Sequence, residues 1–318
     1  MTRRSLAMLP RRLLQAVPVV FLATFLVFGL LKLLPGDIAV TLAGENATEA
    51  RIAEIRSLYG LDQPFLVQYA QWLWNALHGD LARSLLSGEK VAETIARCYP
   101  NTLLIVGLAI VISVVVAVPL GILAATRPGS RLDGAVMTLA SVGVALPNFW
   151  LAMLLVSLLA LDLGLFPATG FVSPFRDVGQ ALWHAVLPAL ALAASGIAEV
   201  ARQLRSALVE VLSSQHVRTL VAKGLRPSSI LWKHGLRNVG VTMLTVVSLL
   251  VNRTLAATVV VEAVFAIPGM GGAIVNAAIQ RDFPVVQGVV LAMVVTVIVV
   301  NLATDLLYGA LDPRINRA

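Results

Sequence analysis

Long apolar segments separated by polar connections dominate this sequence. Six of them are 20 to 27 residues long and contain few charged side chains. A helix needs about 20 apolar residues to cross a bilayer, and in lipid such a segment satisfies its backbone hydrogen bonds only as a helix. The pattern therefore predicts an all-α, polytopic membrane protein. Its six transmembrane helices are expected at residues 13–34, 101–125, 136–161, 185–204, 239–265 and 285–308.

Prolines interrupt two of these segments. Pro147, followed by Asn148, lies inside the third, and Pro188 lies inside the fourth. Proline removes a backbone donor and its ring clashes with the preceding turn, so we expect a kink at each position.

Basic side chains gather in alternate connections. They occupy the N-terminal tail, the connections after the second and fourth segments, and the C-terminal tail. Cytoplasmic loops carry an excess of Lys and Arg, so this alternation places both termini in the cytoplasm. The connection after the fourth segment is the most basic, with a single acid, Glu210. Its basic residues are Arg202, Arg205, Arg218, Lys223, Arg226, Lys233 and Arg237.

The longest external segment, residues 35–100, is expected to fold into a small cap. It carries eight acidic and five basic side chains, a net charge of −3. One short helix is expected from Thr48, as N-cap, to Tyr59, with Gly60 as its stop signal.

A second helix is expected in the cap at residues 65–77, and it carries Trp72 and Trp74. Tryptophans are enriched at membrane interfaces, so both are candidates for an aromatic belt. This organisation predicts an N-terminal region of tail, first helix and cap (1–100) and a core domain (101–318).

The cytoplasmic loop at about residues 202–238 is too long to serve only as a connection. Residues 215–223 predict a short amphipathic helix, capped by Ser213 or Ser214. Its expected apolar face consists of Val217, Leu220 and Val221.

Gly224 fits the left-handed position that ends such a helix, and Pro227 prevents its continuation. We expect the next helix to begin at Ser228 or Ser229. A short helix bounded by sharp turns can transmit force from a partner, or it can lie on anionic lipid.

Residues 217–225, followed by His234-Gly235-Leu236-Arg237-Asn238, resemble the coupling loop of binding-protein-dependent ABC importer permeases. The closest likeness is to the dipeptide, oligopeptide and nickel permeases. Arg218-Thr219-Leu220 replace the general Glu-Ala-Ala, and Thr242 stands where a proline is common. Further matching stretches lie at residues 34–37, 59–64, 261–271 and 311–314.

This resemblance implies a type I importer permease bundle in the bacterial inner membrane. The implied substrates are short peptides, with nickel complexes or glutathione as alternatives. The implied partners are a second permease subunit forming a heterodimer, two cytoplasmic ATPase subunits or domains, and an external substrate-binding protein. The coupling residues would be Arg218, Thr219, Leu220, Val221, Ala222, Lys223 and Gly224.

Charged and polar residues inside the spans are candidates for the translocation path. Arg253, with Asn252 beside it, lies near the middle of the fifth span. An ionisable group there costs about 2.5–3.5 kcal/mol on insertion scales, so Arg253 must face either the path or a protein partner. Glu199 and Arg202 are three residues apart and can pair within one helix.

Two further polar residues, Asn301 and Thr304 of the sixth span, can form hydrogen bonds between helices.

Composition agrees with this interpretation. Hydrophobic residues make up 58% of the 318 residues and charged residues 13%, and the net charge of +7 follows topology, not nucleic-acid binding. The chain has one cysteine, Cys98, and its four histidines are scattered, which argues against a disulfide framework or a metal site.

The sequence contains no phosphate-binding G-x-x-x-x-G-K-[ST] motif, so ATP and Mg²⁺ are expected in partner subunits and no cofactor or enzymatic activity in this chain. The competing interpretation is a secondary transporter or channel. It would require mid-membrane ion-coupling groups, for which Glu199 and Arg253 are the candidates.

Overall fold

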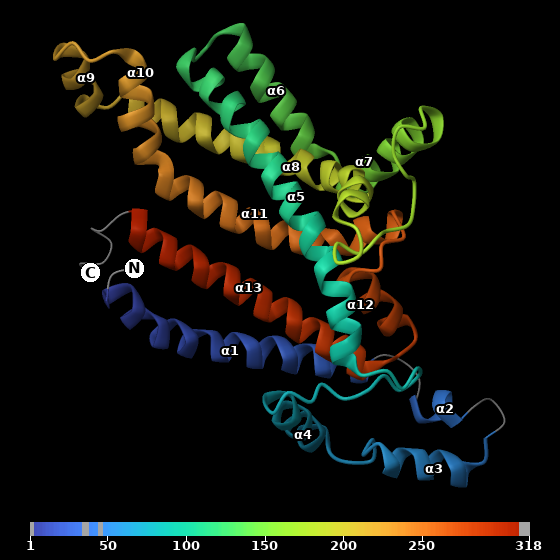
Figure 1. Cartoon of the computed structure of the whole chain (residues 1–318). Coiled ribbons are helices and arrows are strands. Elements are labelled where there is room, and N and C mark those ends of the chain that lie inside the picture. The colour runs from blue at the N-terminus through green and yellow to red at the C-terminus, as the bar shows by residue number, and fades with distance from the viewer. Residues whose placement is uncertain (1–2, 34–37, 44–46, 312–318) are drawn as a thin grey trace. The chain divides into compact units, whose positions relative to one another are not determined.

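The computed structural model describes residues 3–33, 38–43 and 47–311 (Figure 1). The regular secondary structure of the described residues is helical, apart from one isolated antiparallel bridge between Arg83 and Lys90. The helices are α1 (Arg3–Leu33), α2 (Ile38–Ala43), α3 (Glu49–Leu58), α4 (Phe65–Leu77), α5 (Val91–Thr126), α6 (Arg131–Ala145), α7 (Asn148–Leu155), η1 (Val156–Asp162), α8 (Val178–Leu212), α9 (Gln215–Ala222), α10 (Pro227–Ser229), η2 (Ile230–Gly235), α11 (Leu236–Val264), α12 (Met270–Ile279) and α13 (Phe283–Leu311).

Five helical stretches in the described residues are long and apolar enough to cross a membrane. They are Leu14–Leu33, Val91–Thr126, Val178–Leu212, Pro227–Val264 and Phe283–Gly309. All five contain or overlap a predicted span, and the prediction of an all-helical membrane protein is confirmed.

The third predicted span is not one helix. α6 and the α7–η1 segment meet at an angle of 97°, and they make a sixth span only if the bent pair is counted as one. Leu146 is extended because the residue before proline is disfavoured in the helical region, and Pro147 then becomes the N-cap of α7. The predicted kink at Pro147 is therefore a break. Pro188, in contrast, lies within α8, which runs through it.

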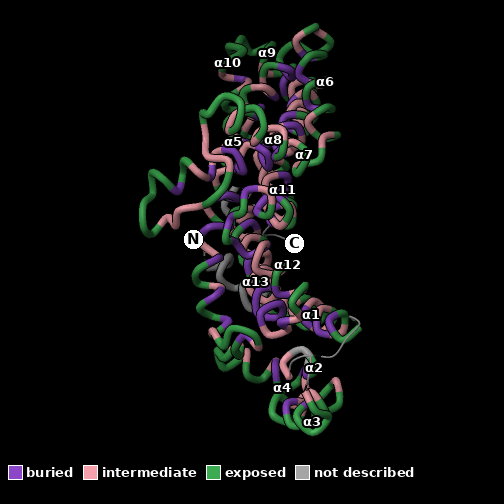
Figure 2. The backbone as a smooth tube through the Cα atoms, turned by 90° about the vertical axis from the view of Figure 1, so that its right-hand side faces the viewer, coloured by how far each residue is buried: buried purple, intermediate pink, exposed green. Residues whose placement is uncertain are grey.

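The described chain forms two compact units. The described residues within Met1–Leu9, Asn101–Ile267 and Val299–Ala318 form unit 1, and those within Pro10–Pro100 and Pro268–Ile298 form unit 2. Unit 1 is built around α8, which packs against α6, α7 and α11. Buried positions recur along α8, which Figure 2 shows in purple. Small residues allow the close approach, and a Cβ added at Gly196 would lie 2.5 Å from Ser113 Oγ.

Unit 2 joins α1 to the cap. Phe25, Phe28, Phe65 and Tyr69 make edge-on aromatic contacts, and the Tyr69 hydroxyl lies 2.9 Å from Thr24 Oγ1. Trp72 is buried in this cluster, so it is not part of an interfacial belt as predicted, while Trp74 is exposed.

The predicted ends of α3 are confirmed. Thr48 Oγ1 accepts a hydrogen bond from Arg51 N at 3.4 Å, and Gly60 adopts a left-handed φ of +63° just after the helix.

The hairpin at residues 82–90 is fixed to the start of α13 within unit 2. Ser84 donates a hydrogen bond to the Asp282 carboxylate, and Leu85 N donates to Asp282 Oδ1 at 3.1 Å. The Tyr99 hydroxyl on α5 lies 2.8 Å from Thr296 Oγ1 on α13. These contacts couple the cap to the last predicted span.

Candidate functional site

The predicted cytoplasmic helix exists as α9, Gln215–Ala222. Ser214 is its N-cap, and its Oγ accepts a hydrogen bond from Val217 N at 3.5 Å. Its C-terminus closes with two backbone bonds, from Gly224 N to Val221 O and from Leu225 N to Leu220 O. This is the Schellman pattern, which requires a left-handed residue, and Gly224 supplies it with φ +76°.

The next helix begins earlier than predicted. Pro227 is its first residue and Arg226 its N-cap, so neither Ser228 nor Ser229 starts it. Proline suits this position because the first helical N–H has no intrahelical partner. From Pro227 the chain stays helical through α10, the π-helical η2 and α11 to Val264.

The predicted apolar face of α9 is divided in two. Val217 is 5% exposed and anchors the helix, and Leu220 is half-buried. Val221 is 60% exposed, together with Arg218 and Lys223. The expectation of one buried face is therefore wrong for Val221, and α9 offers an apolar side chain between two cations.

Two histidines that are scattered in the sequence meet beside α9. The rings of His216 and His234 lie edge to face with centroids 5.8 Å apart. Their separation of 18 residues gives no local signal for this pairing. It places α9 against η2, from which the helical run to α11 continues.

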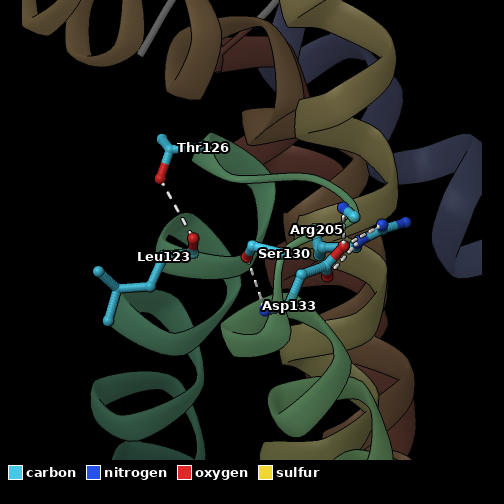
Figure 3. Close-up of polar contacts among 6 residues, drawn as sticks. Leu123, Thr126, Ser130, Asp133 and Arg205 are labelled. Carbon is cyan, nitrogen blue, oxygen red and sulfur yellow. Dashed lines mark hydrogen bonds and ion pairs between the residues drawn. The ribbon is translucent and has the colours of Figure 1, made fainter.

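An ion pair joins the first turn of α6 to α8 (Figure 3). Arg205 donates from Nε to Asp133 Oδ1 at 3.0 Å and from Nη2 to Oδ2 at 2.6 Å. Asp133 Oδ2 also accepts from Gly129 N at 2.9 Å.

Ser130 caps α6 by accepting a hydrogen bond from Asp133 N at 3.2 Å. Sequence reasoning treated Arg205 only as a topology signal. The pattern Ser130-x-x-Asp133 is typical of a helix start, but it gives no signal for the pairing of Asp133 with Arg205.

A second ion pair joins α8 and α11 inside the predicted membrane region. Arg253 Nη1 lies 2.6 Å from Glu199 Oε2, with side chains 71% and 18% exposed, respectively. The expected pairing of Glu199 with Arg202 on the same helix is therefore replaced by a pairing between helices.

A small cavity of about 160 Å³ adjoins this ion pair. Besides Glu199 and Arg253, it is lined by the polar residues Asn148, Ser195 and Thr254. Asn148 is the first residue after the break at Pro147, so the break in the third span brings a polar side chain into this cavity.

Neighbouring polar residues link α11 to α13. Asn252 Nδ2 donates to Asn301 Oδ1 at 3.2 Å, and Thr304 Oγ1 donates to Ser248 Oγ at 3.0 Å. The predicted interhelical roles of Asn301 and Thr304 are confirmed. A buried acid that the sequence reasoning did not single out, Glu262, accepts from Thr102 Oγ1 at 2.6 Å.

Among the described residues, no three His, Cys, Asp or Glu side chains converge into a group that could hold a metal ion. The chemically distinctive features are instead a capped cytoplasmic helix and polar groups inside apolar helices. Both suit a protein that moves a solute.

Comparison with known families decides the assignment. Residues 117–317 match the model of the binding-protein-dependent transport system inner membrane component, and residues 5–106 match that of its N-terminal part. The chain belongs to this family. The permease is thus an inner membrane component of a binding-protein-dependent transporter, as predicted, and ATP hydrolysis resides in other subunits.

Curated relatives match the permease along nearly its whole length. A putative peptide transport system permease protein of Brucella abortus is 41% identical over 97% of this chain and 98% of its own. The oligopeptide permease AppB of Bacillus subtilis is 36% identical over 96% of this chain and 98% of its own. The dipeptide permease DppB of Escherichia coli is 35% identical over 96% of this chain and 97% of its own. The resemblance seen in the sequence is confirmed.

Among solved structures, a chain of the inward-facing MetNI methionine ABC transporter shares the fold. The two chains superpose with a TM-score of 0.58 and are 19% identical. The match covers 70% of this permease and 97% of that chain. At this identity the likeness concerns the fold alone.

Proposed function

We propose that this permease forms half of the translocation path of an ATP-driven importer of short peptides. A second, related permease subunit forms the other half of the heterodimer, and two ATPase subunits or domains lie on the cytoplasmic side. An external binding protein delivers the peptide to the cap, whose net charge of −3 favours a basic docking surface. Relatives named for peptide, oligopeptide and dipeptide transport support the choice of substrate.

The observation that carries this proposal is the architecture of α9. Its ends are fixed by Ser214 and Gly224, and Val217 anchors it, while Val221 stays exposed between Arg218 and Lys223. An exposed apolar side chain flanked by cations suits a groove on a partner protein. Residues 218–224 are therefore assigned to ATPase coupling.

A continuous helical run connects the coupling segment to the membrane interior. Between Pro227 and Arg253 the chain remains helical, which at about 1.5 Å per residue corresponds to a rod of about 40 Å. A displacement of α9 by the ATPase would reach Arg253 through this rod. Closure of the ATPases would thereby change access to the path.

Arg253 and Asn252 are assigned to the translocation path. The Arg253 side chain is largely exposed although its helix is apolar, so in the bilayer it must face a polar path or a second subunit and not lipid. A peptide with free ends carries a carboxylate and an ammonium group. These complement Arg253 and Glu199, and a passing peptide would replace each partner of the ion pair in turn.

Uptake of a labelled dipeptide tests this proposal. The assembled importer, with its binding protein and ATP, would be compared in proteoliposomes as wild type, Arg253→Gln and the external control Arg176→Gln. We expect Arg253→Gln to lower uptake of the dipeptide about tenfold, because a charge-assisted hydrogen bond is lost, and uptake of its C-terminal amide much less.

Equal losses for both peptides would assign Arg253 to a structural contact, not to the path. Uptake of glutathione or a nickel complex without any uptake of dipeptide would overturn the substrate assignment.

A further inference from the structure

A larger cavity, of about 460 Å³, lies within unit 2 and has no part in the proposed path. It is open to the surface and is lined by the last turn of α1, the end of α3, one face of α4, the hairpin at 82–90 and the first turns of α13. By topology this end of α1 and the cap are external. The cavity therefore lies where the outer leaflet meets water.

The chemistry of the lining favours an anion. Lys32 and Arg83 contribute positive charge, and Gln71 and Asn75 contribute amide donors. Among the described residues that line the cavity there is no carboxylate. The nearby Asp282 carboxylate already accepts hydrogen bonds from Ser84 and Leu85 N.

Trp72 provides a second, independent indication of a ligand. It lines the cavity and is only 8% exposed, and its indole Nε1 is buried without a hydrogen-bond partner in the described structure. Buried N–H groups are almost always paired, and an acceptor that enters from the cavity would complete this one once the side chains around Nε1 move aside.

The surroundings of the cavity point to a lipid. The rings of Phe28 and Phe283 form apolar walls, and the volume is much larger than a free phosphate needs. α4 also carries an exposed apolar face made of Leu66, Val67, Trp74 and Leu77. An amphipathic helix with such a face lies at the boundary between headgroups and acyl chains.

We propose that this cavity binds the phosphate-bearing headgroup of an anionic phospholipid of the outer leaflet. Arg83 and Lys32 supply the charge, and Trp72 Nε1 donates to a headgroup oxygen. Because the lining comes from α1, the cap and α13, a bound lipid holds these parts of unit 2 together.

Native mass spectrometry of the assembled importer, titrated with phosphatidylglycerol, tests the site. Arg83→Gln is expected to weaken retention of phosphatidylglycerol about tenfold, and Trp72→Phe, which keeps the ring but removes the N–H, about threefold. Arg51→Gln is the matched control, because it removes the same charge from the cap outside this cavity. It should leave retention unchanged.

Two further arms distinguish the source of the anion. Inorganic phosphate at millimolar concentration should not displace phosphatidylglycerol, and uncharged diacylglycerol should not be retained. Equal retention by wild type and Arg83→Gln would overturn the proposal, as would displacement by phosphate or by a dipeptide. If Trp72→Phe lowers the melting temperature without lipid, Arg83→Gln and Arg51→Gln still decide the outcome.

Discussion

Individual charged residues in unit 1 acquire their partners from distant parts of the chain. Arg205 reaches Asp133, 72 residues away, and Arg253 reaches Glu199, 54 residues away. The sequence identified Glu199 and Arg253 as unusual because charge inside an apolar helix is costly. It suggested the wrong partner for Glu199, because spacing along one helix reveals only local pairs. Tertiary pairs depend on how the helices pack.

The Asp133–Arg205 ion pair should stabilise the cytoplasmic end of unit 1. Its two-pronged geometry and the burial of Asp133 make it stronger than an ordinary surface pair. Arg205→Met is expected to lower the melting temperature of the purified complex by a few degrees. Arg202→Met, which changes an exposed arginine one turn away, should have little effect. The double variant Arg205→Met/Asp133→Asn is the control. If its melting temperature falls by the sum of the two single effects, the ion pair contributes nothing to stability.

Whole elements followed the hydrophobic pattern more closely than single contacts did. The helix at Phe65–Leu77 has its predicted bounds, and α9 differs from prediction by one residue at its end. These elements were predictable because caps, glycines and apolar spacing act locally. The break at Pro147 was foreseen only as a kink, since its 97° angle depends on the packing of α6 and α7 against α8.

Close packing of α8 gives a testable prediction at this scale. Gly196→Ala would place a Cβ 2.5 Å from Ser113 Oγ and 3.0 Å from Leu250 Cδ2. We therefore expect this substitution to lower the free energy of unfolding by about 1–3 kcal/mol. Gly134→Ala on α6, where no atom lies within 4 Å of the new Cβ, should be neutral or slightly stabilising. Thermal unfolding of the purified complex measures both. Adding Ser113→Ala should recover part of the loss, and no recovery would exclude this clash as the cause.

For the whole molecule, the charge alternation and the short motifs sufficed to identify the family. They did so because the topology and the ends of the coupling helix are determined by residues that are close together in the sequence. The motif at residues 34–37 and most of that at 311–314 lie outside the described residues. The exposure of Val221 and the cavity in unit 2 required three-dimensional packing.

In the proposed importer, α9 transmits ATPase closure to the membrane path. Binding-protein-stimulated dipeptide uptake by the reconstituted importer tests it most directly, with Val221→Asp compared against Val178→Asp. These valines are equally exposed, 60% and 61%, but Val178 is expected on the external side. We predict that Val221→Asp lowers uptake at least about tenfold, because a hydrated carboxylate replaces the apolar side chain that packs in the ATPase groove, whereas Val178→Asp transports like wild type. Normal uptake with Val221→Asp, or uptake by this chain alone driven by an ion gradient, would contradict the account.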